Sequence, residues 1–162
     1  MMAFFVLYLN RVIKIIAERE FVMSKKVPQE EIVMNLFSTR YLDSVRKKTE
    51  EIAKQMGFDE EQIFDLALVV DEAYVNAIEH GAEGRTDTEL EIKYLVFDDK
   101  LEISIKDCGR GFDMNKISVP NNLKSISSTR GRGLGLMKLL TDEFFMESKP
   151  GVGTTIKFSK YL

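Results

Sequence analysis

Apolar residues recur along most of the chain with two different periods, one typical of helices and one typical of strands. Two stretches carry apolar residues every three or four positions, which predicts one helix that ends at Gly57 and a second that ends at Gly81. We expect Ser38 to cap the first helix. Asp59 and Gln62 have the spacing of a capping box and are expected to open the second.

The other apolar segments alternate with polar residues, as strands do. Asp98-Asp99 lies between two such segments and predicts a hairpin, whereas the pattern from Gly133 onward predicts a third helix. The predicted strands cover residues 32–37, 90–96, 101–105, 144–148 and 154–158, with a turn at 150–153. This order predicts an α+β fold, a two-layer sandwich in which a mixed, mainly antiparallel β-sheet carries helices on one face.

Composition narrows the class of protein. A chain of 162 residues fits one domain. Its net charge of −3 does not support a broad basic surface, so no direct contact with nucleic acid is expected. Cys108 is the single cysteine of the sequence, which excludes an intramolecular disulfide and fits a reducing, cytoplasmic compartment.

Residues 1–30 are expected to form an N-terminal extension ahead of a domain over residues 31–162. The apolar run Met1–Leu9 is interrupted by Asn10 and Arg11, well short of the roughly 20 residues of a membrane span, and it lacks the features of a signal peptide. Either the extension docks on the domain or on a partner, or the chain has an upstream start codon and Met23 is its native beginning. We favour the second interpretation.

One helix carries two residues suited to phosphate chemistry. Glu72 and Asn76 are four residues apart and therefore lie on one face of the second predicted helix. An asparagine oxygen can occupy one position around Mg²⁺ and leave the others to phosphate oxygens and water. One turn away, Glu72 can reach the proton of an incoming hydroxyl group.

Two glycine-rich segments complete a candidate nucleotide site. Asp107 follows an apolar strand and precedes Gly109 and Gly111, so its carboxylate can accept a hydrogen bond from an exocyclic amine while the backbone approaches a flat ring. The segment 130–136 contains several glycines and opens the third helix. The amide N–H groups at the start of a helix have no partner within it and are free to bind phosphate. Together the segments predict a site for ATP and Mg²⁺.

Other phosphate-binding motifs fit less well. A dinucleotide-binding glycine motif requires a strand that runs directly into the loop, but residues 121–129 are polar and read as a loop. The Walker motif fails because the chain has no Gly-Lys-Ser/Thr sequence. Arg130 and Arg132 flank Gly131, and each can either hold the triphosphate as a bidentate donor or face solvent.

These three segments, in this order, resemble the GHKL (Bergerat-fold) ATPases. Residues 72–80 look like the N box of that superfamily, residues 107–112 like its first glycine box and residues 131–136 like its second. The Asp-Glu-Ala-x-x-Asn-Ala-x-x-His-Gly form of residues 71–81 and the strand entry at residues 151–156 are most similar to the anti-sigma factor serine kinases.

The resemblance implies a role for each residue. It makes Glu72 the general base, Asn76 the magnesium ligand and Asp107 the acceptor of the adenine amine. Thr155 would assist Asp107 through its hydroxyl group, although an ordinary β-branched strand residue is the alternative. Residues 114–129 would form the ATP lid. The implied nucleotide-binding set is Asn76, Asp107, Gly109, Gly111, Arg130, Gly131, Arg132, Gly133, Leu134, Gly135 and Thr155.

The resemblance also implies an activity and partners. The chain would be an ATP-dependent serine/threonine-protein kinase and anti-sigma factor that phosphorylates a STAS-domain anti-sigma factor antagonist, binds a sigma factor and forms a homodimer. Arg46, on the charged face of the first helix, would contact both partners, although a solvated helix face explains it nearly as well. A nucleotide-dependent binding module without phosphotransfer, or a partner-switch kinase that does not act on a sigma factor, remain as alternatives.

Overall fold

The computed structural model describes residues 27–36, 39–81, 89–114 and 132–162. Several predictions therefore lie outside the described residues. They concern the native start at Met23, the cap at Ser38, Arg130, Gly131 and all of the expected lid except its first residue, Met114.

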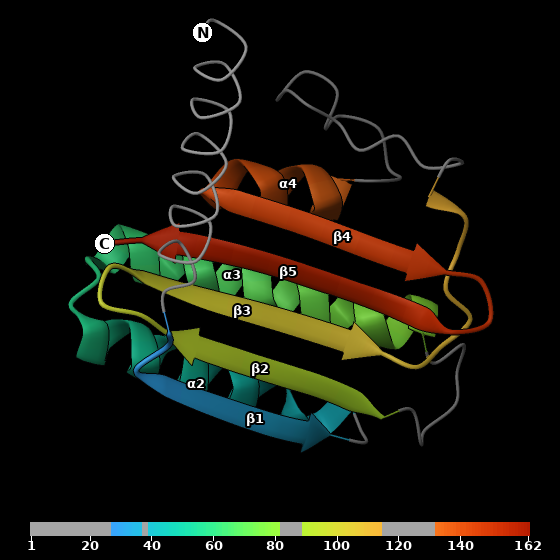
Figure 1. The fold of residues 1–162 in the computed structure, drawn as a ribbon, viewed down its shortest axis with the longest axis horizontal. Helices are drawn as coiled ribbons and strands as arrows, with labels where there is room; N and C mark the ends of the chain where they lie inside the picture. The colour runs from blue at the N-terminus through green and yellow to red at the C-terminus, as the bar shows by residue number, and fades with distance from the viewer. Residues whose placement is uncertain (1–26, 37–38, 82–88, 115–131) are drawn as a thin grey trace, which may run out of the picture.

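Five strands form one sheet with the order β1-β2-β3-β5-β4 (Figure 1). All four pairs of neighbouring strands are antiparallel. The expected sheet was mixed and mainly antiparallel, and its described strands contain no parallel pair. The strands are β1 (Glu30–Leu36), β2 (Leu90–Val96), β3 (Lys100–Asp107), β4 (Glu143–Lys149) and β5 (Gly153–Tyr161).

The sheet register brings two distant segments together. β2 and β3 form the predicted hairpin around Asp98-Asp99, and β5 then pairs with β3 rather than lying at the sheet edge. In this pairing Asp107, at the end of β3, lies opposite Thr154, at the start of β5. The end of β3 therefore meets the turn between β4 and β5, at the right of Figure 1.

The helices α2 (Leu42–Met56), α3 (Glu60–Asn76) and α4 (Arg132–Leu140) pack with their apolar sides against the sheet core (Figure 1). α2 follows a short 3₁₀ turn, and its N-cap residue is Tyr41, which makes no side-chain capping bond. Gly57 ends α2 in the left-handed conformation, as predicted.

The start and the end of α3 differ in kind. Asp59 and Gln62 form the predicted capping box, with each side chain bound to the other's backbone N–H. At the other end, the α-helical pattern stops at Asn76 and continues as a π-helical turn over Ala77–Gly81. Such wider turns are rare in proteins as a whole. Those that do occur often lie at functional sites.

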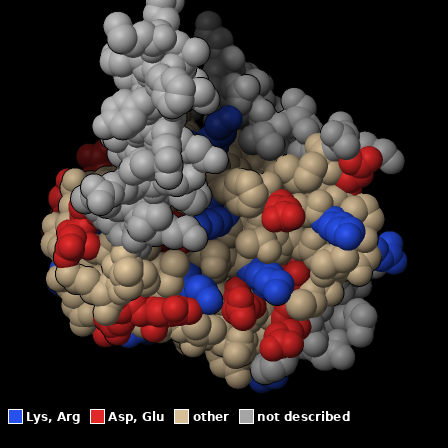
Figure 2. Space-filling view, in the orientation of Figure 1, with Lys and Arg blue, Asp and Glu red and all other residues tan. Residues whose placement is uncertain are grey.

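The two faces of the sheet have different environments. The face toward the helices is closed by fully buried side chains, of which Tyr94 bonds to Thr49 of α2 at 3.0 Å; burial raises the pKa of Tyr94 to about 12. The other face carries alternating charges (Figure 2), which pair across strands as in Lys93 with Glu31 at 2.9 Å and Lys157 with Glu102 at 2.8 Å. This alternation identifies which strand residues face the core.

Candidate functional site

Glu72 lies where α3 meets the first turn of α4. A Cβ atom added to Gly133 would overlap Oε1 of Glu72, and it would also lie 2.7 Å from Cδ of the same carboxylate. The Glu72 carboxylate therefore occupies the space that a side chain at position 133 would need. The contact places the carboxylate proposed as the base beside the helix start at which the sequence predicts phosphate.

Asn76 carries a polar atom without a partner. Its Nδ2 atom is buried and makes no hydrogen bond to any described residue. A buried amide group in this state costs free energy unless a ligand satisfies it. Because the oxygen and nitrogen of a side-chain amide are exchanged by a 180° rotation, either end can occupy that position. The residue thus fits a ligand such as Mg²⁺, whose preferred donors are oxygen atoms.

Asp107 is held rigidly at the end of β3. The residue is only 4% exposed, and its Oδ1 atom accepts hydrogen bonds from the backbone N–H of Gly109 at 2.9 Å and of Thr154 at 3.3 Å. A buried carboxylate is tolerated when donors of this kind surround it. Its position is therefore set by the first glycine segment on one side and by β5 on the other.

The glycine segment after Asp107 is fastened to the turn between β4 and β5. The backbone O of Arg110 accepts a hydrogen bond from Gly151 N at 2.6 Å, and the N–H of Phe112 donates to Oγ of Ser148 at 2.9 Å. Gly111 has a φ of 56°, and a Cβ atom there would overlap the backbone O of Lys149. The structural requirement for glycine at 111 is thus close backbone packing in a left-handed conformation.

The structure does not bring Thr155 together with Asp107. Thr155 pairs with Lys106, and since side chains alternate along a strand, it faces the side of the sheet opposite to Asp107. Thr154 takes the place next to the carboxylate, and its Oγ1 atom lies 2.9 Å from Oγ of Ser148. The shift by one residue follows from the register of β3 and β5, which the sequence does not specify.

Arg46 lies closer to the site than its position in the sequence suggests. Its guanidinium forms an ion pair with Oδ2 of Asp71, the residue before Glu72, and this hydrogen bond raises the pKa of Arg46. The Arg46 side chain is 45% exposed, whereas that of Asp71 is 15% exposed. The other oxygen, Oδ1 of Asp71, is buried without a partner among the described residues.

The remaining predicted residues belong to α4 or directly precede it in the chain. Gly135 is buried and Leu134 packs partly against the core. Arg132 is the first residue of α4, but its side chain is outside the described set, as are Arg130 and Gly131 altogether. The structure therefore places Glu72, Asn76 and Gly133 on one helix pair, and Asp107, Gly109 and Gly111 at the adjoining end of the sheet.

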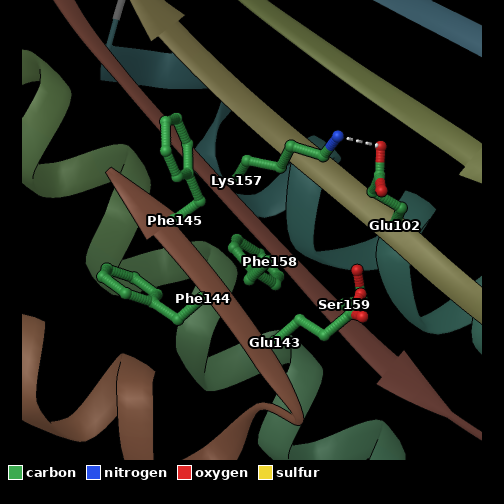
Figure 3. A pocket seen from close by; sticks show the side chains of 7 residues that line it. All are labelled: Glu102, Glu143, Phe144, Phe145, Lys157, Phe158 and Ser159. Carbon is green, nitrogen blue, oxygen red and sulfur yellow. Dashed lines mark ion pairs between the residues drawn. The ribbon is translucent and has the colours of Figure 1, made fainter. Parts of the chain in front are cut away.

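A separate hollow of about 430 Å³ involves none of these residues (Figure 3). Its lining comes from β3, β4 and β5, and the charges in it are paired, as Lys157 with Glu102 shows. The hydrogen bond from Lys100, together with one from Ser159, lowers the pKa of Glu143. Since carboxylates here are neutralised by neighbouring lysines, this hollow offers no better site for a triphosphate than the glycine segments.

Sequence reasoning missed two residues that the structure adds to the site. Thr154 and Ser148 hold the end of β3 and the first glycine segment. Asp71, which precedes Glu72 in the chain, pairs with Arg46. The Gly-x-Gly-Thr-Thr sequence did signal a strand entry. It did not indicate which threonine faces inward, because that depends on the pairing of strands that are far apart in the chain.

Comparisons with known proteins agree with this geometry. Residues 37–160 match the family described as the histidine kinase-like ATPase domain. The serine-protein kinase RsbW of Bacillus velezensis is 33% identical over 128 residues, which cover 75% of this chain and 79% of that protein. The protein of the same name in Listeria monocytogenes is 30% identical over 131 residues, with 75% and 80% covered.

Solved structures show the same fold. The RsbU and RsbW domains of Rv1364c from Mycobacterium tuberculosis match with a TM-score of 0.54 and 19% identity, over 80% of this chain and 32% of that one. A histidine kinase domain from Erythrobacter litoralis matches with a TM-score of 0.51 and 18% identity, over 75% and 59%. Within the described part of this chain, no helix has the length and apolar character needed to cross a membrane.

Proposed function

Because this chain belongs to the family of histidine kinase-like ATPase domains, we propose that it is an ATP-dependent serine/threonine-protein kinase and an anti-sigma factor. The relatives named serine-protein kinase support the reaction type. The observation that carries the proposal is the contact of Glu72 with Gly133, which joins a carboxylate to the helix start where phosphate is expected.

The reaction asks for positioning more than for covalent chemistry. Bound Mg²⁺ would neutralise charge on the triphosphate, and Asn76 is the residue of this chain that would hold it. Glu72 accepts the proton of the acceptor hydroxyl group while the oxygen of that hydroxyl group bonds to the γ-phosphorus of ATP. The bond between the γ-phosphorus and the β-phosphate oxygen breaks, and ADP leaves with its electrons. A carboxylate beside a helix N-terminus is favourably placed, because the helix dipole stabilises negative charge there.

The base-binding end is the second part of the proposal. Asp107 would accept a hydrogen bond from the adenine amine, and its fixed position favours a base that presents a donor over one that presents a carbonyl group. The backbone N–H of Thr154 holds Asp107, and the hydroxyl group of Ser148 holds the glycine segment through Phe112. We therefore expect ATP to be preferred over GTP, and Asp107→Asn to narrow that preference.

The partners form the third part. The substrate would be a STAS-domain anti-sigma factor antagonist, the second partner a sigma factor, and the protein a homodimer. A regulator of a sigma factor acts in the cytoplasm, so that location belongs to the same proposal. The support for this choice of partners is the sequence similarity of this chain to the RsbW kinases.

The test is label transfer. Purified protein is incubated with Mg²⁺, ATP labelled at the γ-phosphate and the STAS-domain proteins of the same genome, one at a time. We expect label on a serine or threonine of one of them. If one of them binds in an ATP-dependent way without gaining label, the chain is a nucleotide-dependent binding module instead. If labelling occurs and no sigma factor binds, it is a partner-switch kinase with another target.

A further inference from the structure

α3 carries an exposed aromatic side chain two turns before Glu72. Phe64 is 66% exposed, which is unusual for a residue of its size and apolar character. Leu68 is partly exposed. Positions 64, 68 and 72 are four residues apart, so the three side chains follow one side of the helix. We call this row Phe64, Leu68 and Glu72 the α3 track.

The neighbouring helix adds to the apolar end of the track. Nζ of Lys160 donates to Oδ2 of Asp65 at 3.2 Å and to the backbone O of Leu140 at 2.8 Å, so the start of α3 and the end of α4 are adjacent. Leu139 of α4 is 51% exposed. Lys160 thus binds the residue that follows Phe64 in α3 and the residue that follows Leu139 in α4.

Carboxylates without an ion pair among the described residues lie next to this end. α3 contains five carboxylates and no lysine or arginine. Asp65 pairs with Lys160 and Asp71 with Arg46. Glu60 and Glu61, one turn before Phe64, are exposed and form no ion pair with another described residue. They favour the helix N-terminus, and they also leave two negative charges available to a partner.

We propose that Phe64 is a specificity-determining residue for the acceptor protein. The inference rests on the proposed kinase function, because a protein whose hydroxyl group reaches Glu72 can also cover the exposed residues of the α3 track. Eight residues of helix span about 12 Å. The acceptor protein would therefore present an exposed apolar side chain about 12 Å from its phosphorylated hydroxyl group, with a basic residue beside it that faces Glu60 and Glu61.

The chain offers a matched control. Phe145 is 56% exposed and lies on β4, on the face of the sheet away from the helices. The experiment measures initial rates of phosphate transfer against acceptor concentration, at saturating ATP and Mg²⁺, with the STAS-domain protein that the unaltered chain labels. We expect Phe64→Ala to raise the KM for this acceptor by roughly tenfold, with kcat and the KM for ATP unchanged. Phe145→Ala should change none of them.

A second pair of variants tests the charge. The double variant Glu60→Gln with Glu61→Gln should raise the acceptor KM and weaken its dependence on salt, because exposed charges are screened. Glu147→Gln, an exposed carboxylate on β4, is the control. Melting temperatures of all variants exclude loss of folding as the cause.

The outcomes separate two kinds of failure. An unchanged acceptor KM in Phe64→Ala, or equal effects of Phe64→Ala and Phe145→Ala, overturns the inference and leaves the kinase function intact. Absence of transfer to any STAS-domain protein by the unaltered chain overturns the proposed function itself, and the inference falls with it.

Discussion

At position 133 the need for glycine comes from the neighbouring helix. The atoms that a Cβ would meet are those of the Glu72 side chain, which can rotate away, rather than fixed backbone. At position 111 the atoms belong to the backbone of Lys149 and Gly153, and φ is positive. The two glycines therefore serve different ends: one positions the proposed base, and the other permits a backbone conformation.

This difference gives the first prediction. Gly133→Ala should displace the Glu72 carboxylate and reduce phosphate transfer by about tenfold or more, with a change in melting temperature of at most a few degrees. Gly111→Ala should lower the melting temperature more, since strain at positive φ costs roughly 1–2 kcal/mol in addition to the clash. Equal loss of stability in both variants would contradict this assignment. The measurements are thermal unfolding and initial transfer rates.

The unpartnered amide of Asn76 gives the second prediction. Asn76→Ala should weaken binding of the Mg²⁺ complex of ATP much more than binding of ATP in the presence of a chelator, because only the contact through the metal is lost. Calorimetric titration with and without Mg²⁺ measures both affinities. The ligand role is wrong if the Mg²⁺ dependence of the variant equals that of the unaltered chain.

At the scale of single residues, the sequence predicts which residues share a helix or a glycine segment. It does not predict contacts between distant segments, and two such contacts differ from expectation. Glu72 and Asn76 share a helix face by spacing alone, so the sequence suffices to pair them. Thr154 rather than Thr155 lies beside Asp107 because of the β3–β5 register, and Asp71 binds Arg46 because α2 and α3 pack together. Those two facts depend on contacts between segments far apart in the chain.

At the scale of elements, the ion pair of Arg46 with Asp71 joins α2 and α3, two helices that also pack through buried apolar side chains. A partly exposed pair of this kind contributes about 0–1 kcal/mol to stability, so its structural role is small. It holds Arg46 near Glu72, where a partner of the kinase would have to dock. The proposed role of Arg46 as a partner contact thus competes with its internal pair.

Two variants distinguish these roles. Arg46→Ala should weaken binding of both the antagonist and the sigma factor by about 1 kcal/mol or more, at unchanged ATP affinity. Asp71→Ala releases the guanidinium and should leave partner binding equal or tighter. Equal weakening by both variants would show that only the pair matters and that Arg46 contacts no partner. Affinity measurements for each partner provide the answer.

Helix ends illustrate what local sequence determines. The capping box at Asp59 and the glycine stop at Gly57 were predicted correctly, since both depend on neighbouring residues. The π-helical turn after Asn76 was not, because the helical pattern continues through it to Gly81. That turn changes the direction of the residues that follow Asn76, which a simple periodicity does not reveal.

At the scale of the whole molecule, the two-layer α+β sandwich and the family resemblance are confirmed. Alternation of apolar residues suffices to predict each strand, but the insertion of β5 between β3 and β4 does not follow from it. That insertion brings the β4–β5 turn to the end of β3, where it fastens the first glycine segment.

The N-terminal extension gives a prediction at this scale. If Met23 is the native start, as the sequence favours, a shortened chain that begins there should match the full chain in melting temperature and in ATP affinity. A decrease of several degrees, which corresponds to about 1 kcal/mol in a domain of this size, would show that residues 1–22 are structural. A change in subunit number would show the same.

The central claim is that Glu72 removes the proton from an acceptor hydroxyl group in an ATP site formed by α3 and α4. The most direct measurement compares single-turnover phosphate transfer and ATP affinity in the unaltered chain and in Glu72→Gln. We predict that transfer falls by about 10²–10⁴-fold while ATP binding stays nearly the same, because the amide retains the shape of the side chain but cannot accept the proton. Unchanged transfer in Glu72→Gln would contradict the account.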